Sequence, residues 1–161
     1  MATWGEFTEA APEIAALGSE LRAKFGLAFL ATVRKDGSPR LHPVCPFVVR
    51  GRLFIATNPK SPKRHDLKRD GRYVLHMLPG ENDAEFLIRG RARLVEDAET
   101  KAMVLAEGPE AGRQPDGALL NLKPEELLFE YDIAEALSGH WENVGQPDTR
   151  PVRSTWREDT H

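Results

Sequence analysis

Closely spaced apolar runs, separated by tight turns, restrict this chain to folds built from antiparallel strands. Asp36-Gly37 is a typical hairpin turn, and "RGR" at 50–52 is too short to contain a crossover. Parallel strands need a connection of a dozen or more residues, usually a helix. The predicted strands span residues 27–33, 40–49, 53–57, 72–78, 85–97 and 126–136. This order predicts a mainly β fold with a few helices, in which antiparallel hairpins close into a small barrel.

Three helices are expected around the strands. They span residues 12–25, 61–70 and 98–108. The first has apolar residues at helical spacing, a Pro at its start and a Gly after its end. In the second, Ser61 is the expected N-cap and Pro62 the first helical residue. The third is expected to end at Gly108.

The length, charge and cysteine content limit the classes of protein to which this chain can belong. A chain of 161 residues suits a single domain, with the barrel at about 27–136 and a C-terminal tail at 137–161. Lys and Arg number 22 against 25 Asp and Glu, so the net charge is −3, which argues against a nucleic-acid or anionic-membrane binder. Cys45 is alone, no metal-ligand spacing is present and no signal peptide is evident, so we expect a cytoplasmic protein without a metal site.

The strand predicted at 40–49 contains two prolines, which a regular central strand does not tolerate. Pro43 and Pro46 are three residues apart, so they remove one N–H donor from each side of the strand. An edge or bulged strand would explain them. Alternatively, the irregular backbone from His42 to Pro46 faces a ligand instead of a neighbouring strand. The sequence leaves both interpretations open.

A basic segment follows the strand predicted at 53–57. Residues 60–72 hold six Lys and Arg against two Asp, although the whole chain is acidic. Lys63 and Arg64 fall in the first turn of the predicted helix, where cations oppose the helix dipole unless an anion offsets them. A helix N-terminus is also a common phosphate site. Residues 60–72 are therefore either a solvated basic face or a phosphate site.

The order "FLATVRKDGSPRLHPV", "LFIATNPKSPKRHDL", "RYVLHML", "EFLIRGRARLVED" resembles the pyridoxamine 5′-phosphate oxidase-like flavin-binding split barrels. The resemblance covers about residues 25–97 well and the helix and strand on either side more loosely. It implies a six-stranded antiparallel split β-barrel. It also implies a homodimer that binds FMN at the interface between protomers.

The resemblance also assigns positions to cofactor binding. The matched residues are Leu41, His42, Pro43, Val44 and Cys45, whose backbone lines the isoalloxazine ring, Ala56 and Thr57 at a strand end, Ser61 and Lys63 in the phosphate turn, and Glu85, where the oxidase has Gln. Pro62 stands where the oxidase has a phosphate-binding Arg, and Pro46 lies near the position of a family Lys. Arg64 or Arg40 is expected to replace the lost charge.

The resemblance implies an FMN-dependent oxidoreductase that exchanges a hydride with a small organic substrate and possibly NAD(P)H. The oxidase's substrate-binding His and Arg residues near the C-terminus have no match here, so another substrate is expected, and no catalytic residue is assigned. Two alternatives keep the fold. One is a deazaflavin-dependent reductase, whose acidic cofactor tail would suit residues 60–72, and the other is a non-enzymatic flavin or haem binder.

Overall fold

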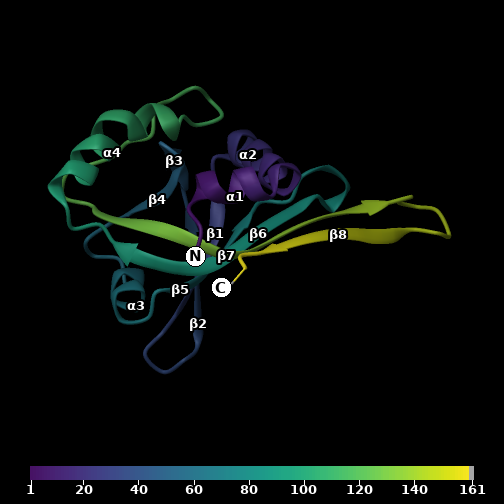
Figure 1. Ribbon diagram of the computed structural model, residues 1–161, viewed down its shortest axis with the longest axis horizontal. Coiled ribbons are helices and arrows are strands. Elements are labelled where there is room, and N and C mark those ends of the chain that lie inside the picture. Colours follow the sequence, from purple (N-terminus) through teal and green to yellow (C-terminus); the bar gives the residue numbers. More distant parts are fainter. Residues whose placement is uncertain (160–161) are drawn as a thin grey trace.

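The computed structural model describes residues 1–159 as a curled antiparallel sheet with helices packed against it (Figure 1). The strands are β1 (Ala28–Val33), β2 (Pro39–Val44), β3 (Phe47–Val49), β4 (Arg52–Thr57), β5 (Arg72–Met77), β6 (Glu85–Leu94), β7 (Leu127–Glu142) and β8 (Arg150–Arg157). The helices are α1 (Trp4–Ala10), α2 (Pro12–Phe25), α3 (Lys63–Arg69) and α4 (Ala98–Ala111), with a short 3-10 turn, η1 (Glu81–Asp83). The predicted mainly β split-barrel fold is confirmed.

The sheet has eight strands where the sequence predicted six. Its order is β2-β1-β5-β6-β7-β4-β3, and β8 pairs with β7 outside this path. The strand expected at 40–49 is interrupted at Cys45 and Pro46, so it forms β2 and β3 as two separate strands at opposite ends of the sheet order. The tail expected at 137–161 instead contains the end of β7 and all of β8.

The barrel is open where the two ends of the sheet order meet. β2 pairs only with β1, so its other edge has no strand neighbour among the described residues. β3 covers β4 only as far as Phe54, so Ile55–Thr57 also lack a strand neighbour on that side. Because only Cys45 and Pro46 connect β2 to β3, these two incomplete edges converge at one corner. We call this opening the split.

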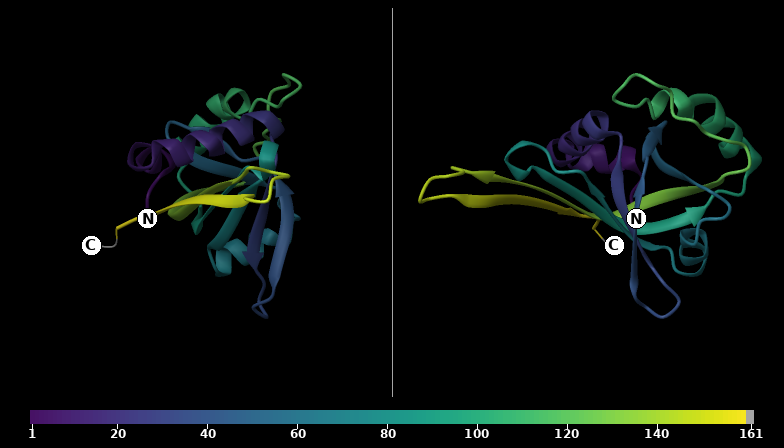
Figure 2. Two further views of the ribbon diagram at one scale, coloured as in Figure 1. Left: turned by 90° about the vertical axis from the view of Figure 1, so that its right-hand side faces the viewer. Right: turned by 180° about the vertical axis from the view of Figure 1, so that it is seen from behind.

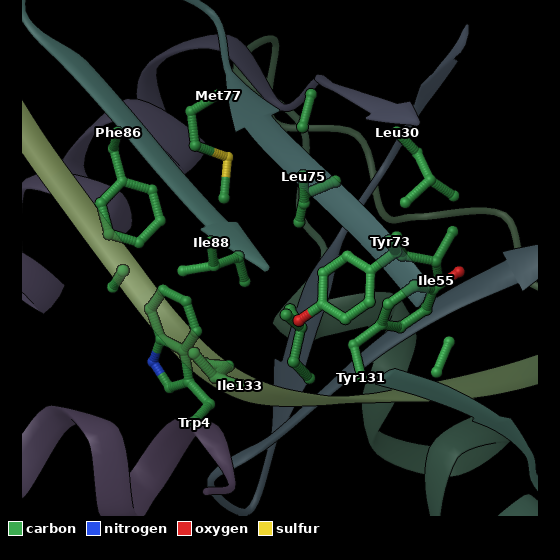
Figure 3. Packing of buried hydrophobic residues seen from close by; sticks show 14 of the residues in the cluster. Trp4, Leu30, Ile55, Tyr73, Leu75, Met77, Phe86, Ile88, Tyr131 and Ile133 are labelled. Carbon is green, nitrogen blue, oxygen red and sulfur yellow. The ribbon is translucent and has the colours of Figure 1, made fainter. Parts of the chain in front are cut away.

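Two hydrophobic cores stabilise the sheet. The larger one fills its concave face, where Tyr73 and Tyr131 meet edge to face at 4.8 Å and the helical Trp4 packs on Phe86 (Figure 3). The smaller core lies between the other face of the β3–β4 hairpin and α4, and consists of Phe47, Val49, Phe54, Val95, Val104 and Leu128. The sheet is therefore apolar on both faces near the split, which holds β4 firmly in place.

The helices differ from the predictions in three respects. α2 has the predicted bounds, and Gly26 closes it with a positive φ of 67°. α4 continues past Gly108 to Ala111. Gly108 lies inside the helix because its missing side chain leaves room for Phe47 and Leu122 to pack against the helix surface. α3 begins at Lys63, and Ser61 makes no capping hydrogen bond. The sequence reading also omitted α1, which Thr3 caps.

A register shift in β6 shapes the middle of the sheet. It falls between Arg89 and Gly90, opposite β7. A Cβ atom at Gly90 would lie 2.0 Å from the carbonyl oxygen of Asp132, so this bulge requires glycine.

The end of β7 and β8 form a long hairpin whose tip stands clear of the helices (Figures 1 and 2). Its base is fixed by Trp156, which packs 5.2 Å from Phe7. Beyond Gly139, β7 pairs only with β8. Within residues 1–159, no helix has both the length and the apolar character that crossing a membrane requires.

Candidate functional site

The concave face of β2 carries polar side chains next to the split. Along β2, Arg40, His42 and Val44 share the face of the buried β1 residues, whereas Leu41 and Pro43 point to the convex face and are exposed. This alternation follows from the two-residue period of a strand. It divides the predicted ring-binding segment into two sides with different chemistry.

Asp66 fixes α3 against this polar face. Its carboxylate accepts hydrogen bonds from the Thr32 hydroxyl at 2.9 Å and from Arg40 Nε at 2.7 Å, and Arg69 lies 3.4 Å from it. Burial raises the pKa of Asp66, but the bonds from Arg40, Thr32 and Arg69 outweigh burial, so the pKa lies below its usual value. Asp66 is therefore charged at neutral pH, and it connects α3 to both β1 and β2.

Lys63 is the most unusual residue of the cluster. It is only 9% exposed, although it is the first residue of α3. Its Nζ donates to the Ser61 hydroxyl at 3.2 Å, and no carboxylate pairs with it among the described residues. Burial lowers its pKa. A buried ammonium normally has an anionic partner, so Lys63 has the properties expected of an anion ligand.

His42 lies in the field of this lysine. Burial lowers the pKa of His42, and the positive charges of Lys63 and Arg40 lower it further, against the opposing effect of Asp66. The imidazole is therefore neutral at pH 7 and can both donate and accept a hydrogen bond. The structure thus brings together Arg40, His42, Ser61 and Lys63 from the predicted cofactor residues. Arg40 is already paired with Asp66 and is not a free replacement charge.

The turn before α3 differs from a phosphate-binding helix start. The N–H groups of Arg64 and His65 already donate to the carbonyl oxygens of Ser61 and Pro62, at 3.2 and 3.1 Å. Few free backbone donors therefore remain at the start of this seven-residue helix. An anion at this turn would be held mainly by the side chains of Lys63 and Ser61.

The β4 residues lie on opposite faces of their strand. Thr57 is fully buried, and its hydroxyl has no hydrogen-bond partner among the described residues. Ala56 faces α4 and lines a mostly apolar cavity of about 240 Å³. Cys45, at the corner, is half-buried, and burial raises the pKa of its thiol, so it is protonated at neutral pH. Arg64 is half-buried and belongs to the same turn as Lys63.

Glu85 lies away from this cluster. It starts β6 on the convex face, 3.8 Å from His76 Nε2 and 3.5 Å from Arg153 Nε. α3 instead contacts β1 at Thr32 and lies on the concave side. One protomer therefore does not bring Glu85 and Lys63 to the same site.

Two residues that organise the site were absent from the sequence-based set. Asp66 and Thr32 hold α3 in place, although neither matches a cofactor-binding position. An acid inside a predicted helix that is otherwise rich in Lys and Arg was the available signal. The described residues contain no group of three or more His, Cys, Asp or Glu side chains placed to hold a metal ion.

Comparisons with known proteins agree with this architecture. A sequence-family model described as pyridoxamine 5′-phosphate oxidase matches residues 17–131. A comparison with curated proteins gave no match. Three similar solved structures, all under 25% identical to the chain, show likeness in fold alone.

The first is a haem-binding protein from Mycobacterium smegmatis, with 16% identity and a TM-score of 0.60 over 88% of this chain and 57% of that one. The chain therefore spans little more than half the length of that protein. The second is a conserved hypothetical protein from Mycobacterium tuberculosis, with 22% identity and a TM-score of 0.62 over 76% of this chain and 82% of that one. The third is a protein from Clostridium acetobutylicum related to general stress protein 26, of the pyridoxinephosphate oxidase family, with 14% identity and a TM-score of 0.60 over 87% of this chain and 91% of that one.

Proposed function

Since the chain belongs to the pyridoxamine 5′-phosphate oxidase-like family, we propose that it binds FMN at the split and acts as an FMN-dependent oxidoreductase on a small organic substrate. The observation that carries the proposal is Lys63, a buried ammonium whose only polar partner within residues 1–159 is a serine hydroxyl. The phosphate of FMN would supply the missing anionic partner. Flavin bound there would supply the hydride transfer.

The residues present fit this cofactor at its phosphate end. Lys63 and Ser61 would donate to the phosphate, and Arg40 would add positive potential while it stays paired with Asp66. His42, neutral and half-buried, would offer a hydrogen bond toward the ring end. The uncovered edge of β2 would orient the ring, and Pro43 would keep that edge from recruiting another strand.

We propose that the working unit is a homodimer with the cofactor at the interface. Phe29 and Leu41 are 40% and 65% exposed on the convex face, next to Pro43 of the same strand pair. An apolar patch of this kind is typical of an association surface. Because Glu85 lies on this convex face and Lys63 does not, a second protomer is needed if both are to contact one cofactor.

A visible spectrum and an FMN titration of the purified protein test the proposal. FMN binding with a flavin absorption spectrum is the expected result, and reduction of the bound flavin by NAD(P)H would support the oxidoreductase assignment. A haem spectrum would favour the haem-binding alternative, which the likeness to the mycobacterial haem-binding protein supports. Activity only with added deazaflavin would favour the reductase alternative. A protein that binds none of the three contradicts the proposal.

Sedimentation of a Phe29→Asp variant tests the dimer. The change places a charge on the convex face without opening the core, so a monomer that retains its fold is expected. Leu119→Asp is the matched control, because Leu119 is 53% exposed in a different part of the chain. A wild-type monomer that retains FMN at micromolar concentration would contradict the shared site.

A further inference from the structure

A second basic site lies at the opposite end of α3 from Lys63. A groove of about 540 Å³ opens between the β1–β2 hairpin, the end of α3 and the strands β5 and β6. Its lining residues are Val33, Arg34, Lys35, Gly37, Arg69, Asp70, Arg72 and Arg91. Five of these eight are cations and one is an acid. Since α3 has seven residues, about 10 Å separates its two ends, so this groove is distinct from the cluster around Lys63.

Most of the positive charge in the groove is not neutralised. Asp70 binds Arg72 through Nε at 3.0 Å and through a terminal nitrogen at 2.6 Å, and these bonds lower the pKa of Asp70 to about 2. Arg69 donates to the Val33 carbonyl oxygen and contacts Asp66, outside the groove. Arg34, Lys35 and Arg91 form no ion pair among residues 1–159.

The other nearby acids are occupied. Asp36 of the hairpin accepts bonds from the backbone N–H and the hydroxyl of Ser38. Glu135 of β7 pairs with Arg89 and Arg157, and Asp132 pairs with Arg93. Three cations of the groove, Arg34, Lys35 and Arg91, are therefore left without an ion-pair partner among the described residues.

Two of these cations are direct neighbours across strands. Arg72 of β5 and Arg91 of β6 are register partners in the antiparallel ladder. Like charges directly opposite each other on one face of a sheet are destabilising. A chain with a net charge of −3 has acids available for such a position. The repulsion between Arg72 and Arg91 is offset by Asp70, which binds Arg72 and is also near Arg91, and by Asp132, the register partner of Arg91 in β7.

We propose that this groove binds a phosphate anion of two or more charges, either free as pyrophosphate or as the end of a larger ester such as a nucleoside diphosphate. Guanidinium groups match phosphate oxygens in bidentate geometry. Three cations without partners favour a multiply charged ligand over a single carboxylate. Val33 and Gly37 also line an adjoining groove of about 870 Å³, into which the rest of an ester could extend.

Calorimetric titration of the flavin-free full chain with pyrophosphate and with ADP tests the proposal at low ionic strength. Arg91→Gln should weaken binding about tenfold or more, the effect of losing a charge-assisted hydrogen bond. Lys68→Gln is the matched control, because Lys68 is exposed on α3 but does not line the groove. It should change affinity less than twofold. Tighter binding of ADP than of pyrophosphate would identify an ester as the ligand, and the reverse order would identify the free anion.

Thermal unfolding with and without pyrophosphate distinguishes a ligand-binding role of Arg91 from a role in stabilising the fold. Without ligand, Arg91→Gln should melt close to the wild-type temperature, because the acids near Arg91 balance its repulsion from Arg72. Pyrophosphate should raise the melting temperature of the wild type and raise that of Arg91→Gln little or not at all.

Four results would overturn the proposal. The first is no binding of either probe at millimolar concentration. The second is equal losses in Arg91→Gln and Lys68→Gln, which would indicate bulk charge. The third is loss of binding in Lys63→Ala but not in Arg91→Gln, which would place the anion at the other end of α3. A short single-stranded oligonucleotide that binds more tightly than ADP would also contradict it. Lys63 contributes only to the FMN site, so failure here leaves the flavin proposal standing.

Discussion

Replacing Lys63 by methionine should change flavin affinity and protein stability in opposite directions. Methionine preserves the length and the apolar stem of the side chain and removes only the charge. In the flavin-free protein, that charge is buried, and the Ser61 hydroxyl is its single partner in the described part of the chain. In the flavin complex proposed above, the same charge is the main ligand of the phosphate. A purely structural lysine would not show this opposition.

The size of the affinity effect follows from the single charge-assisted hydrogen bond that is lost. Such a bond contributes about 1.5–3 kcal/mol, so the dissociation constant of FMN should rise roughly 10- to 150-fold. Riboflavin lacks the phosphate, and its affinity should be nearly unchanged by the substitution. The ratio of FMN to riboflavin affinity therefore isolates the contribution of the phosphate.

The stability effect has a defined pH dependence. Burial lowers the pKa of Lys63 from its usual value of 10.5, so the flavin-free folded state binds this proton less tightly than the unfolded state. The charge destabilises the fold fully below the folded pKa, and the penalty disappears as the pH rises to the unfolded pKa. Lys63→Met should therefore raise the flavin-free melting temperature at pH 7, and the gain over wild type should shrink as the pH rises through the lowered folded pKa towards 10.5.

Fluorescence titration of FMN and riboflavin, with thermal unfolding at pH 7 and pH 10, measures both effects. Lys68→Met is the control, since Lys68 is exposed on the same helix, and it should change neither quantity appreciably. The reasoning is refuted if Lys63→Met binds FMN like the wild type. It is also refuted if FMN and riboflavin lose affinity equally, because the phosphate would then lie elsewhere.

Three further predictions follow from residues described above. Without flavin, Pro43→Ala should melt within a few degrees of the wild type, because a freed N–H on an edge strand disturbs no ladder. In titrations it should weaken FMN binding if the β2 edge orients the ring. Unchanged affinity would mean that β2 is an ordinary edge strand. Gly90→Ala should lower the free energy of unfolding by roughly 2–4 kcal/mol in denaturant titrations, since its Cβ would meet the Asp132 carbonyl oxygen at 2.0 Å. A change in this free energy close to zero would contradict the tight bulge. Asp66→Asn should lower the free energy of unfolding by about 2–4 kcal/mol at pH 7, because it leaves Arg40 without its partner. The folded pKa of Asp66 is lowered, so the difference from wild type should shrink as the pH falls below about 4. A pH-independent difference would exclude this ion pair as its cause.

The strands and α2 were predictable because their signals are local. Alternating apolar runs, Asp36-Gly37 and the glycine after α2 each act within a few residues, and the structure contains the features they indicate. The two prolines of the second predicted strand also marked a real irregularity. Whether Pro46 bulges a strand or turns a corner depends on which distant strands its neighbours pair with, and no local signal contains that information.

The remaining differences have the same origin. Gly108 ends a helix by local rules, but in the fold its missing side chain admits Phe47 and Leu122 to the helix surface. β8 has charged and polar residues on both faces, so it lacks the alternation that identifies a strand, and its partner β7 determines its conformation. In the site, the pairing of Asp66 with Arg40 joins residues 26 positions apart, so sequence spacing could not reveal that Arg40 is already occupied.

The protruding β7–β8 hairpin has a consequence for the behaviour of the protein in concentrated solution. The outer edge of β8 has no strand neighbour within the described part of the chain, and an uncovered edge far from the body is a template for fibrillar aggregation. The strand sequence opposes such growth. Pro151 removes one backbone donor, and Arg150, Arg153 and Arg157 each pair with a Glu of β6 or β7, so two hairpins that approach side by side would have to remove water from these ion pairs. The polarity that makes β8 difficult to recognise as a strand is thus what keeps it from recruiting copies of itself.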